Sequence, residues 1–307
     1  MIRIIIITCI ISLLSVLTTA SMAAGPEKII LDTDIGDDVD DAYALALLVN
    51  QPNVKLLGVT TAFGETKERA ELAAKMLNVM GHGSVPVYAG RRGEAKIRGQ
   101  YAWAKGYTSK NLKSTPAVEF LKEEIEKAPG EVTLCAVGPL TNLGDLFSKY
   151  PETKTKIKQI VIMGGAVLVG YGTNPKPEPE WNIKCDPAAA KAVYESGVPL
   201  VMAGLEVTAM MQLEKDRRMV LTGVGTPTTD TLAALTYLWE NQTPTLFDPV
   251  AVAYACGHKF SDEEKMHVVV EDNGLTRITP GTPNVTVLVR PKKEEFLNWY
   301  VSVFKKK

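Results

Sequence analysis

Short runs of apolar residues alternate with longer amphipathic segments along most of the chain, starting at Lys28. Continuous apolar runs of this length are typical of strands buried on both faces, as in a parallel sheet. The segments between them repeat apolar residues at helical spacing, and Gly or Pro often follows. We expect strands at Ile29–Leu31, Val54–Thr60, Val85–Tyr88, Val132–Val137, Gln159–Met163 and Leu200–Ala203, and helices at Asp41–Val49, Lys67–Met80, Ala117–Lys127, Leu140–Lys149 and Asp186–Ser196.

This repeated strand-helix unit fits two folds, a closed (β/α)₈ barrel and an open, doubly wound sheet. The chain has too few clear strands with helices between them to close a barrel. We therefore expect a single open, mostly parallel doubly wound α/β sheet, with helical and loop insertions around a pocket. In both folds the functional groups lie at the carboxyl ends of the strands.

The regular pattern loosens after Glu206. There we expect helices near Asp230–Glu240 and Asp248–Ala255, a closing pair of strands at His267–Val270 and Val285–Val289, and a surface helix at Glu294–Lys307. Two stretches rich in Gly, Pro and aromatic residues, Ala89–Thr108 and Gly170–Pro179, are long enough to be functional loops. Because no low-complexity linker divides residues 24–307, we predict one domain there.

Residues 1–23 have the pattern of a secretory signal peptide. The apolar stretch Ile4–Leu17 follows Arg3 and leads into small residues, with cleavage expected after one of the positions Ala20 to Ala24. The stretch has 14 residues, whereas a helix that spans a membrane needs about 20. This length favours a cleaved leader over a membrane anchor. We therefore predict a secreted or periplasmic protein without stable membrane insertion after cleavage.

The composition, with 46% apolar and 22% charged residues, is that of an ordinary globular chain. The 34 basic and 35 acidic residues give a formal net charge of −1. This balance gives no electrostatic reason to expect nucleic acid or an anionic membrane as a partner, and a small neutral ligand is easier to accommodate. Three cysteines beyond the leader cannot all pair within one chain, so a disulfide scaffold is not expected. The sequence leaves the oligomeric state open, a homo-oligomer included.

Six carboxylates fall within the ten residues from Asp32 to Asp41. No Lys or Arg occurs between Lys28 and Lys55, so local salt bridges cannot offset the repulsion. A predicted buried strand and an Ala/Leu-rich helix bracket the cluster, which places several of these acids at the mouth of the sheet. Crowded carboxylates must either raise their pKa values or share a cation. Oxygen ligands favour Ca²⁺ or Mg²⁺ over Zn²⁺, for which His and Cys would be expected.

On its own, the segment from residue 29 to residue 36 does not decide the class of enzyme. A strand that ends in Asp-x-Asp also opens phosphatases of the haloacid dehalogenase type, in which the first Asp is a nucleophile and Mg²⁺ is bound. That class also needs a later Lys and an acidic pair after an apolar strand, which are not convincingly placed here. An EF-hand loop fails because Gly36 and the required terminal Glu are not at the needed offsets.

Five separated motifs follow one another along the chain, namely Asp32–Gly36, Val137–Asn142, Ile162–Gly165, Glu180–Pro187 and Phe247–Ala253. In this order they resemble the calcium-dependent nucleoside hydrolases, also called inosine-uridine preferring nucleoside N-ribohydrolases. Together the motifs are far more specific than any one of them, and they cover residues 24–307 nearly from end to end. The resemblance implies one open α/β domain, a small-molecule nucleoside as substrate, and one Ca²⁺ ion at the bottom of a pocket.

The same resemblance implies roles for individual residues. Asp34 takes the proton of the attacking water and is also a metal ligand. The implied metal ligands are three carboxylates and one backbone carbonyl, on Asp34, Asp41, Asp248 and Val137. The implied sugar-binding residues are Asp40, Asn174, Glu180 and Asn182. Two further residues are expected to contact the substrate: Trp181 as a wall of the pocket, because it lies between Glu180 and Asn182, and Phe247 against the base.

Three positions depart from the commonest pattern of the family. Two extra residues precede the pair Asp40–Asp41, so Asp38 competes for a metal or ribose role. Glu65 stands where many relatives have an Asn that contacts the sugar. Phe247 stands before the metal-binding Asp, where one subgroup has a His that protonates the departing base.

Without that His, other groups must stabilise the departing base. The histidines beyond the leader, His82, His258 and His267, lie in none of the motifs. We expect Phe247, or the aromatic residues of the segment Tyr101–Trp103, to stack on the base while solvent or a loop residue donates the proton.

We therefore predict Ca²⁺-dependent hydrolysis of the N-glycosidic bond of ribonucleosides to free base and ribose, in nucleoside salvage. A site built of acids repels phosphate, which favours hydrolysis over phosphorolysis. The main alternative is a catalytically silent protein that binds a nucleoside or ribose, and the phosphatase is a weaker one. Release of free ribose separates these classes. The sequence leaves open the preferred base and the choice between ribose and deoxyribose.

Overall fold

A computed structural model describes residues 25–172, 174–240 and 243–305. The predicted signal peptide, residues 1–23, lies outside the described residues. Among the described helices, none has the length and apolar character needed to cross a membrane.

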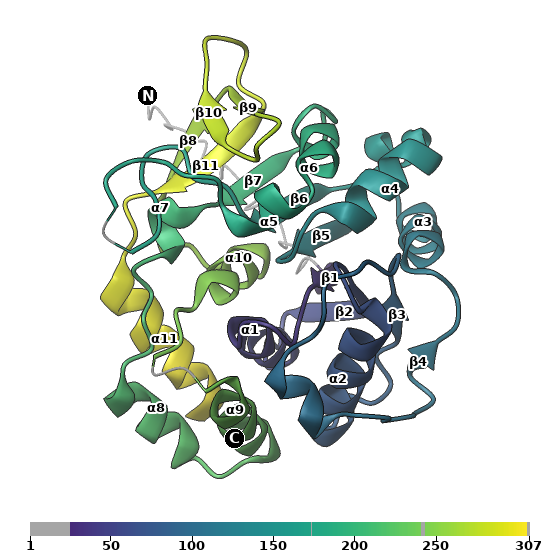
Figure 1. Cartoon of the computed structure of the whole chain (residues 1–307), viewed down its shortest axis with the longest axis vertical. Coiled ribbons are helices and arrows are strands. Elements are labelled where there is room, and N and C mark those ends of the chain that lie inside the picture. The colour runs from purple at the N-terminus through teal and green to yellow at the C-terminus, as the bar shows by residue number, and fades with distance from the viewer. Residues whose placement is uncertain (1–24, 173, 241–242, 306–307) are drawn as a thin grey trace, which may run out of the picture.

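Within the described residues, a sheet of nine strands in the order β4-β3-β2-β1-β5-β6-β7-β11-β8 forms the centre of the molecule (Figure 1). All neighbours in it are parallel except β8, which is antiparallel to β11. Its strands are β1 (Glu27–Thr33), β2 (Val54–Thr61), β3 (Val87–Ala89), β4 (Leu112–Lys113), β5 (Val132–Ala136), β6 (Gln159–Met163), β7 (Leu200–Ala203), β8 (Asp262–Met266) and β11 (Val285–Val289). The predicted open, mostly parallel α/β sheet is confirmed.

Helices cover both faces of the sheet, and each face has its own apolar core. One core packs against α1 (Asp40–Val49), α2 (Thr66–Val79), α8 (Lys215–Thr222), α9 (Pro227–Trp239), α10 (Phe247–Ala255) and α11 (Lys293–Lys305). The other packs against α3 (Ala117–Lys127), α4 (Thr141–Lys149) and α6 (Pro187–Tyr194), at the upper right of Figure 1. Ile29 and Leu31 of β1 face the first core and Ile30 faces the second, which explains why the strand is apolar at consecutive positions.

Shorter elements connect these layers. They are the helices α5 (Trp181–Cys185) and α7 (Leu205–Thr208), and the 3₁₀ helices at Gly99–Trp103 and Pro151–Lys156. The predicted helices and strands before Glu206 are present, with ends that differ by one to a few residues from the expected ones.

The pairing expected for the last strands is wrong. The segment at His267–Val270 does not pair with β11; β9 (Val268–Val270) instead forms a separate antiparallel pair with β10 (Thr276–Ile278). β11 is bordered by β7 and β8. β8 was not expected, because its residues Asp-Glu-Glu-Lys-Met are mostly charged, as suits the exposed edge of a sheet.

The C-terminal helix is also more than a surface element. One face of α11 is buried, and the hydroxyl of Tyr300 donates a hydrogen bond of 2.9 Å to the carbonyl oxygen of Tyr43 in α1. The helix therefore anchors the end of the chain to the core that supports α1.

The order of the strands determines where a ligand can bind. β1 lies between β2 and β5, so the chain leaves β1 toward one edge of the sheet and later returns to its other side. Such a switch point opens a crevice at the carboxyl ends of the two strands. Here those ends are followed by Asp34 and Val137, from two of the five motifs.

Candidate active site

A pocket of about 250 Å³ opens at this switch point. Such a volume, just below the roughly 300–1,000 Å³ of drug-sized sites, suits one small molecule. Its lining is rich in carboxylates at the bottom and in aromatic rings at the mouth. The lining residues are Asp34, Asp37, Asp38, Asp40, Asp41, Arg98, Val137, Met163, Tyr171, Glu180, Trp181, Asn182, Phe247 and Asp248.

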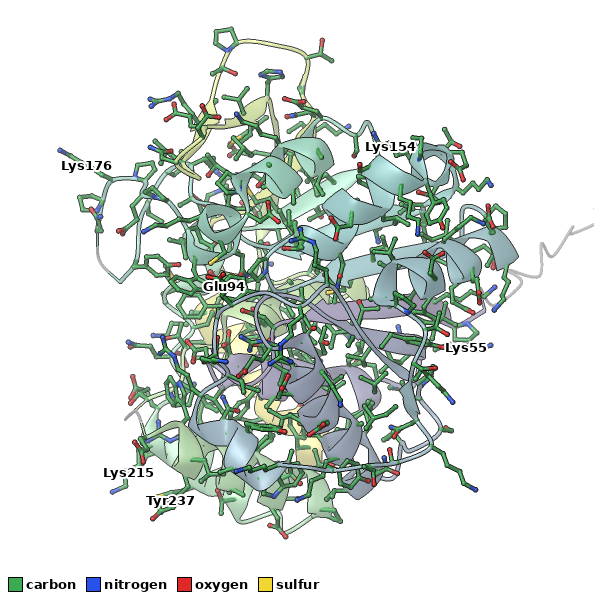
Figure 2. All side chains as sticks on the ribbon, turned by 45° about the vertical axis from the view of Figure 1, so that its right-hand side comes forward. Lys55, Glu94, Lys154, Lys176, Lys215 and Tyr237 are labelled. Carbon is green, nitrogen blue, oxygen red and sulfur yellow. The ribbon has the colours of Figure 1, made fainter. Side chains whose placement is uncertain are left out.

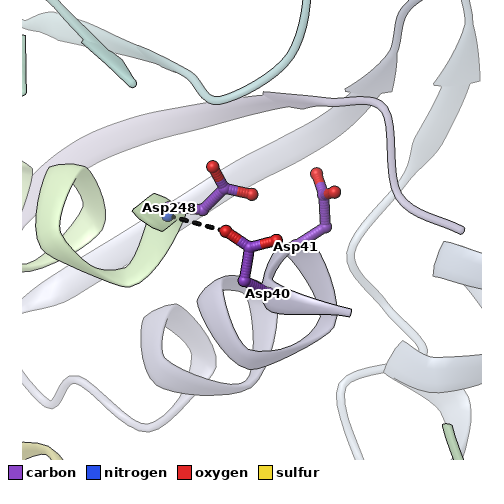
Figure 3. Close-up of side chains that lie close together, drawn as sticks. All are labelled: Asp40, Asp41 and Asp248. Atoms are coloured by element: carbon purple, nitrogen blue, oxygen red, sulfur yellow. Dashed lines mark hydrogen bonds between the residues drawn. The ribbon is translucent and has the colours of Figure 1, made fainter. Parts of the chain in front are cut away.

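Three carboxylates converge at the bottom of the pocket. Asp40 and Asp41 come from the first turn of α1 and Asp248 from the first turn of α10 (Figure 3). One oxygen of each lies within 4.8 Å of the others, and all three side chains are buried. The amide of Asp248 donates a hydrogen bond of 3.1 Å to Oδ2 of Asp40, and the hydroxyl of Thr33 donates to Oδ1 of Asp41.

Burial and mutual repulsion raise the pKa values of these acids. Loss of solvation is the largest cause for Asp40, Asp41 and Asp248, and the charges of the neighbouring carboxylates add to it. The pKa of Asp34 rises to about 7 by burial, which the Arg69 guanidinium partly opposes. Carboxylates in such a state gain most from a shared cation.

The donor set fits a hard divalent ion. Every titratable side chain at the bottom of the pocket is a carboxylate, and no His or Cys lines it among the described residues. Ca²⁺ and Mg²⁺ prefer such oxygen ligands, whereas Zn²⁺ is usually bound by His or Cys. Asp40, which was predicted to bind ribose, belongs to the close cluster together with the predicted ligands Asp41 and Asp248.

Asp34 lies between the side chain of Arg69 and the backbone of Gly138. The Arg69 guanidinium donates to its carbonyl oxygen. Gly138 leaves room for its side chain, because a Cβ at position 138 would lie 2.7 Å from Oδ1 of Asp34 and 2.8 Å from its amide nitrogen. The motif Val137-Gly138 thus has a steric reason for its glycine, and Asp34 has little freedom to move.

Arg69 is a functional residue that the sequence reasoning missed. Its side chain is fully buried and forms an ion pair of 2.8 Å with Asp37, besides donating to the carbonyls of Phe63, Asp34 and Ile35. The residues next to the acidic segment in the sequence include no Lys or Arg, but α2, which follows later in the chain, supplies Arg69. A signal was present, because Arg69 lies on the apolar face of that helix, in register with buried residues three and four positions onward.

The motif at Glu180–Pro187 supplies one wall of the pocket. Glu180 caps α5 and accepts hydrogen bonds from the amides of Asn182, Ile183 and Gly165, at 3.0 to 3.2 Å. The amide nitrogen of the Asn182 side chain donates hydrogen bonds of 2.9 Å to the carbonyl of Val137 and of 3.0 Å to the carbonyl of Met163. Asn182 therefore orients the carbonyl that was predicted to be a metal ligand.

Aromatic rings form the mouth of the pocket. Trp181 is 47% exposed, and the centroid of its ring lies 6.2 Å from the centroid of the Phe63 ring in an edge-to-face arrangement. Tyr171 meets Phe247 edge to face at 6.2 Å, and its hydroxyl accepts a hydrogen bond of 2.9 Å from the amide of Trp181. Tyr171, from the predicted functional loop Gly170–Pro179, is a lining residue that the motifs did not reveal.

Asn174 is not brought into the pocket. Its side chain donates 3.1 Å to Glu178 within the same exposed loop, and Lys176 beside it points away from the molecule (Figure 2). The sugar contact expected for Asn174 therefore stays a prediction that its position does not support.

The expectation for the segment Tyr101–Trp103 is wrong, because neither ring lines the pocket. The hydroxyl of Tyr101 donates a hydrogen bond of 2.6 Å to the carboxylate of Glu71, and the centroid of the Trp103 ring lies 4.2 Å from Nζ of Lys75. Glu71 and Lys75 lie on the outer face of α2. Tyr101 and Trp103 therefore pack on this helix and not in the pocket.

Glu65, one of the departures from the family pattern, turns away from the pocket. Its carboxylate pairs with Arg92 and Lys96, each at 2.9 Å, and accepts a hydrogen bond of 3.2 Å from the amide of Ile97. It therefore anchors the loop after β3 and makes no contribution to the pocket lining.

Asp32 does not line the pocket either. It is buried, and its Oδ1 accepts hydrogen bonds from Thr60 at 2.5 Å and from the side chain of Asn142 at 2.7 Å. Burial raises its pKa to about 6. The phosphatase alternative needs this first Asp as an exposed nucleophile, so the geometry opposes it.

The comparisons with known proteins point to one class. A pyrimidine-specific ribonucleoside hydrolase, RihA of Salmonella arizonae, is 30% identical over 305 residues, covering 88% of this chain and 96% of the relative. Uridine nucleosidase 1 of Arabidopsis thaliana is 34% identical over 204 residues, 62% of this chain and 60% of that protein. A solved plant nucleoside hydrolase, PpNRh1, superposes with a TM-score of 0.82 at 25% identity, over 92% of this chain and 100% of that one.

These relatives are named as hydrolases of nucleosides, and the solved one shares the fold described above. The model of the inosine-uridine preferring nucleoside hydrolase family matches residues 29–298. The chain belongs to this family and is a nucleoside hydrolase. The resemblance carried by the five motifs is thereby confirmed.

Proposed function

We propose that the protein hydrolyses ribonucleosides to free base and ribose with the help of one Ca²⁺ ion, and that Asp34 is the general base. The observation that carries the proposal is the group of buried carboxylates at the switch point. Among the described residues that contact this group, Arg69 is the one buried cation. The family membership supports the reaction, and the residues of this pocket support the mechanism.

The proposed ligands of the ion are the carboxylates of Asp34, Asp41 and Asp248 and the carbonyl of Val137. All line the pocket, and the carbonyl keeps a free lone pair beside its bond to Asn182. Ca²⁺ is preferred to Mg²⁺ because it accepts six to eight oxygen ligands in flexible geometry. When bound, the ion makes a nearby water easier to deprotonate.

Asp34 is suited to take that proton. Its pKa of about 7 without a cation lies near neutral pH, and Gly138 and Arg69 fix its position. A base held within reach of its proton contributes about 10²–10⁴-fold to a rate. Asp38, which also lines the pocket, is the second candidate for this role.

The remaining carboxylates act on the sugar. Cleavage of an N-glycosidic bond gives the ribose ring positive charge, as in O-glycoside hydrolysis, and nearby carboxylates stabilise that charge. Asp40 and Glu180, which both line the pocket, are the proposed carboxylates, and Asn182 holds the carbonyl of Val137 by a hydrogen bond. Water then attacks the anomeric carbon directly, and no covalent nucleophile is needed.

The base of the substrate fits at the mouth of the pocket, against Trp181, Tyr171 and Phe247. The edge-to-face contact between Tyr171 and Phe247 leaves aromatic surface for a flat ring. Two of the relatives carry pyrimidine names, so uridine is the first substrate to test.

A reducing-sugar assay over a panel of ribonucleosides tests the proposal. Purified protein of residues 24–307 is expected to release free ribose with Ca²⁺ present. Binding of nucleosides without any release of ribose would instead identify the catalytically silent alternative. Fractionation of the source cells tests the further proposal of a secreted or periplasmic protein that serves nucleoside salvage.

A further inference from the structure

Arg98 is the one cation among the residues that line the pocket. Its side chain lies near Asp38 at the rim, yet within the described part of the chain its guanidinium has no hydrogen bond or ion pair. By contrast, Arg69 and Arg92 have carboxylate partners at 2.8 and 2.9 Å. The five N–H donors of Arg98 are therefore available to a ligand in the pocket.

The backbone around Arg98 is fixed against the acidic segment. On one side, Ile97 fills the space beside Gly36, where a Cβ would lie 2.4 Å from Cδ1 of Ile97. On the other side, Gln100 is buried and its side-chain amide donates 2.9 Å to the carbonyl of Asp38. The backbone of Arg98 is therefore held in place while its side chain has no partner. A fixed backbone lowers the entropy cost of binding a ligand.

The depth of the pocket decides which part of a nucleoside meets Arg98. The carboxylates of Asp40, Asp41 and Asp248 are buried at the bottom, whereas Arg98 and Trp181 are exposed at the mouth. Hydroxyl groups of ribose match the carboxylates at the bottom. The flat base then lies at the mouth, within the region that Arg98 lines.

We propose that Arg98 is a catalytic residue that stabilises the departing base, and the assignment rests on the proposed function. As water forms its bond to C1′ and loses a proton to Asp34, the C1′–N bond breaks and its electron pair passes to the base. That negative charge spreads onto the ring nitrogens and the carbonyl oxygens of uracil or onto the ring nitrogens and the one carbonyl oxygen of hypoxanthine, where a guanidinium can donate charge-assisted hydrogen bonds. Arg98 stays protonated throughout, and the base anion takes its proton from solvent.

The test compares Arg98→Ala, Arg98→Gln and Arg98→Lys with the wild type on uridine, inosine and p-nitrophenyl riboside. Loss of one such donor typically lowers kcat by about 10²–10³-fold, which we expect for kcat/KM of Arg98→Ala on uridine and inosine. p-Nitrophenolate leaves well without help, so the loss on that substrate is expected to be at least about tenfold smaller. Arg98→Lys keeps the charge and is expected to recover part of the loss, unlike Arg98→Gln.

Arg92→Ala is the matched control, because Arg92 lies on the same loop but pairs with Glu65 and Glu68 outside the pocket. It is expected to treat all three substrates alike. Equal losses on all three substrates with Arg98→Ala, or no loss, would overturn the proposal while leaving the hydrolase function intact. A wild type that releases ribose from none of them would refute the proposed function itself, and the role of Arg98 with it.

Discussion

The amide of Asp248 donates a hydrogen bond of 3.1 Å to the carboxylate of Asp40, although 208 positions separate the two residues. The bond joins the first turn of α10 to the first turn of α1, and each turn contributes carboxylates to the same cluster. The amino-terminal ends of both helices also favour negative charge there. Folding therefore brings the acids together, and an ion that binds them stabilises the folded state alone.

Removal of divalent ions is expected to lower both activity and stability. A ligand that binds only the folded protein stabilises it by about 2.7 kcal/mol at a hundredfold excess over its dissociation constant. A chelator should therefore abolish release of ribose and lower the melting temperature, and added Ca²⁺ should restore both. Mg²⁺ in place of Ca²⁺ is the control for the identity of the ion. Equal melting curves and rates with and without chelator would contradict the metal proposal.

The effect of Ca²⁺ on stability is expected to grow with pH. Burial raises the pKa of Asp34 in the folded protein to about 7, from its usual value of 3.8. Between these values the metal-free folded protein holds more protons than the unfolded chain, so its free energy of unfolding falls as pH rises. That contribution is complete below about pH 4 and is lost as pH rises through 7.

Thermal melting with chelator and with Ca²⁺, at a series of pH values from 5 to 8, measures this effect. The difference between the two melting temperatures should be small at the acid end and large at the alkaline end, because protonated carboxylates do not bind the ion. A difference that stays constant over the series would show that the acids of the pocket do not titrate in this range.

The sequence predicted the parts of this protein that depend on local pattern. Continuous apolar runs revealed the parallel strands, because each strand of such a sheet is buried on both faces. The resemblance of the motifs to a known family pointed to Asp34, Asp41 and Asp248, and all three line the pocket. Parts that depend on a distant partner were missed. β8 is a polar edge strand, and its pairing with β11 leaves no apolar signal.

The same limit explains the errors at the mouth of the pocket. Tyr101 and Trp103 were expected there because loops rich in aromatic residues often carry ligands. In the structure, Glu71 and Lys75 on α2 engage them, and an arginine from the same loop, Arg98, lines the pocket instead. Which side chain of a loop faces a pocket depends on the whole fold, and composition does not reveal it.

Replacement of Arg69 is expected to destabilise the protein strongly. Arg69→Met keeps the apolar stem but leaves Asp37 as a partly buried carboxylate without its partner. Breaking a buried ion pair in this way costs about 3–5 kcal/mol, which urea denaturation can measure. In the double variant with Asp37→Asn the cost should be smaller, because no unpaired charge remains. A loss below about 1 kcal/mol for Arg69→Met would contradict the structural role of the pair.

Replacement of Asp34 is expected to abolish turnover without unfolding the protein. Asp34→Asn keeps the size and one oxygen ligand but cannot accept a proton, so the loss in kcat should exceed the roughly 10²–10⁴-fold attributed to a general base alone. Asp32→Asn is the contrasting variant, because Asp32 is buried outside the pocket and should affect stability more than rate. Near-normal turnover of Asp34→Asn would require another base, and Asp38→Asn would be the next variant to measure.

The last prediction concerns recognition of the base by the aromatic mouth. Trp181 and Phe247 line the pocket, whereas Tyr101 and Trp103 pack on α2. Stacking of a base on an aromatic side chain contributes about 1–3 kcal/mol, so Trp181→Ala and Phe247→Leu should raise KM for uridine and inosine by about 5- to 150-fold. Free ribose as an inhibitor lacks the base, and its inhibition constant should not change. Tyr101→Phe and Trp103→Phe, the matched controls, should leave KM unaltered. If a His82→Ala variant selectively lost uridine and inosine cleavage but still cleaved p-nitrophenyl riboside, a histidine would protonate the base, and this account of the mouth would be wrong.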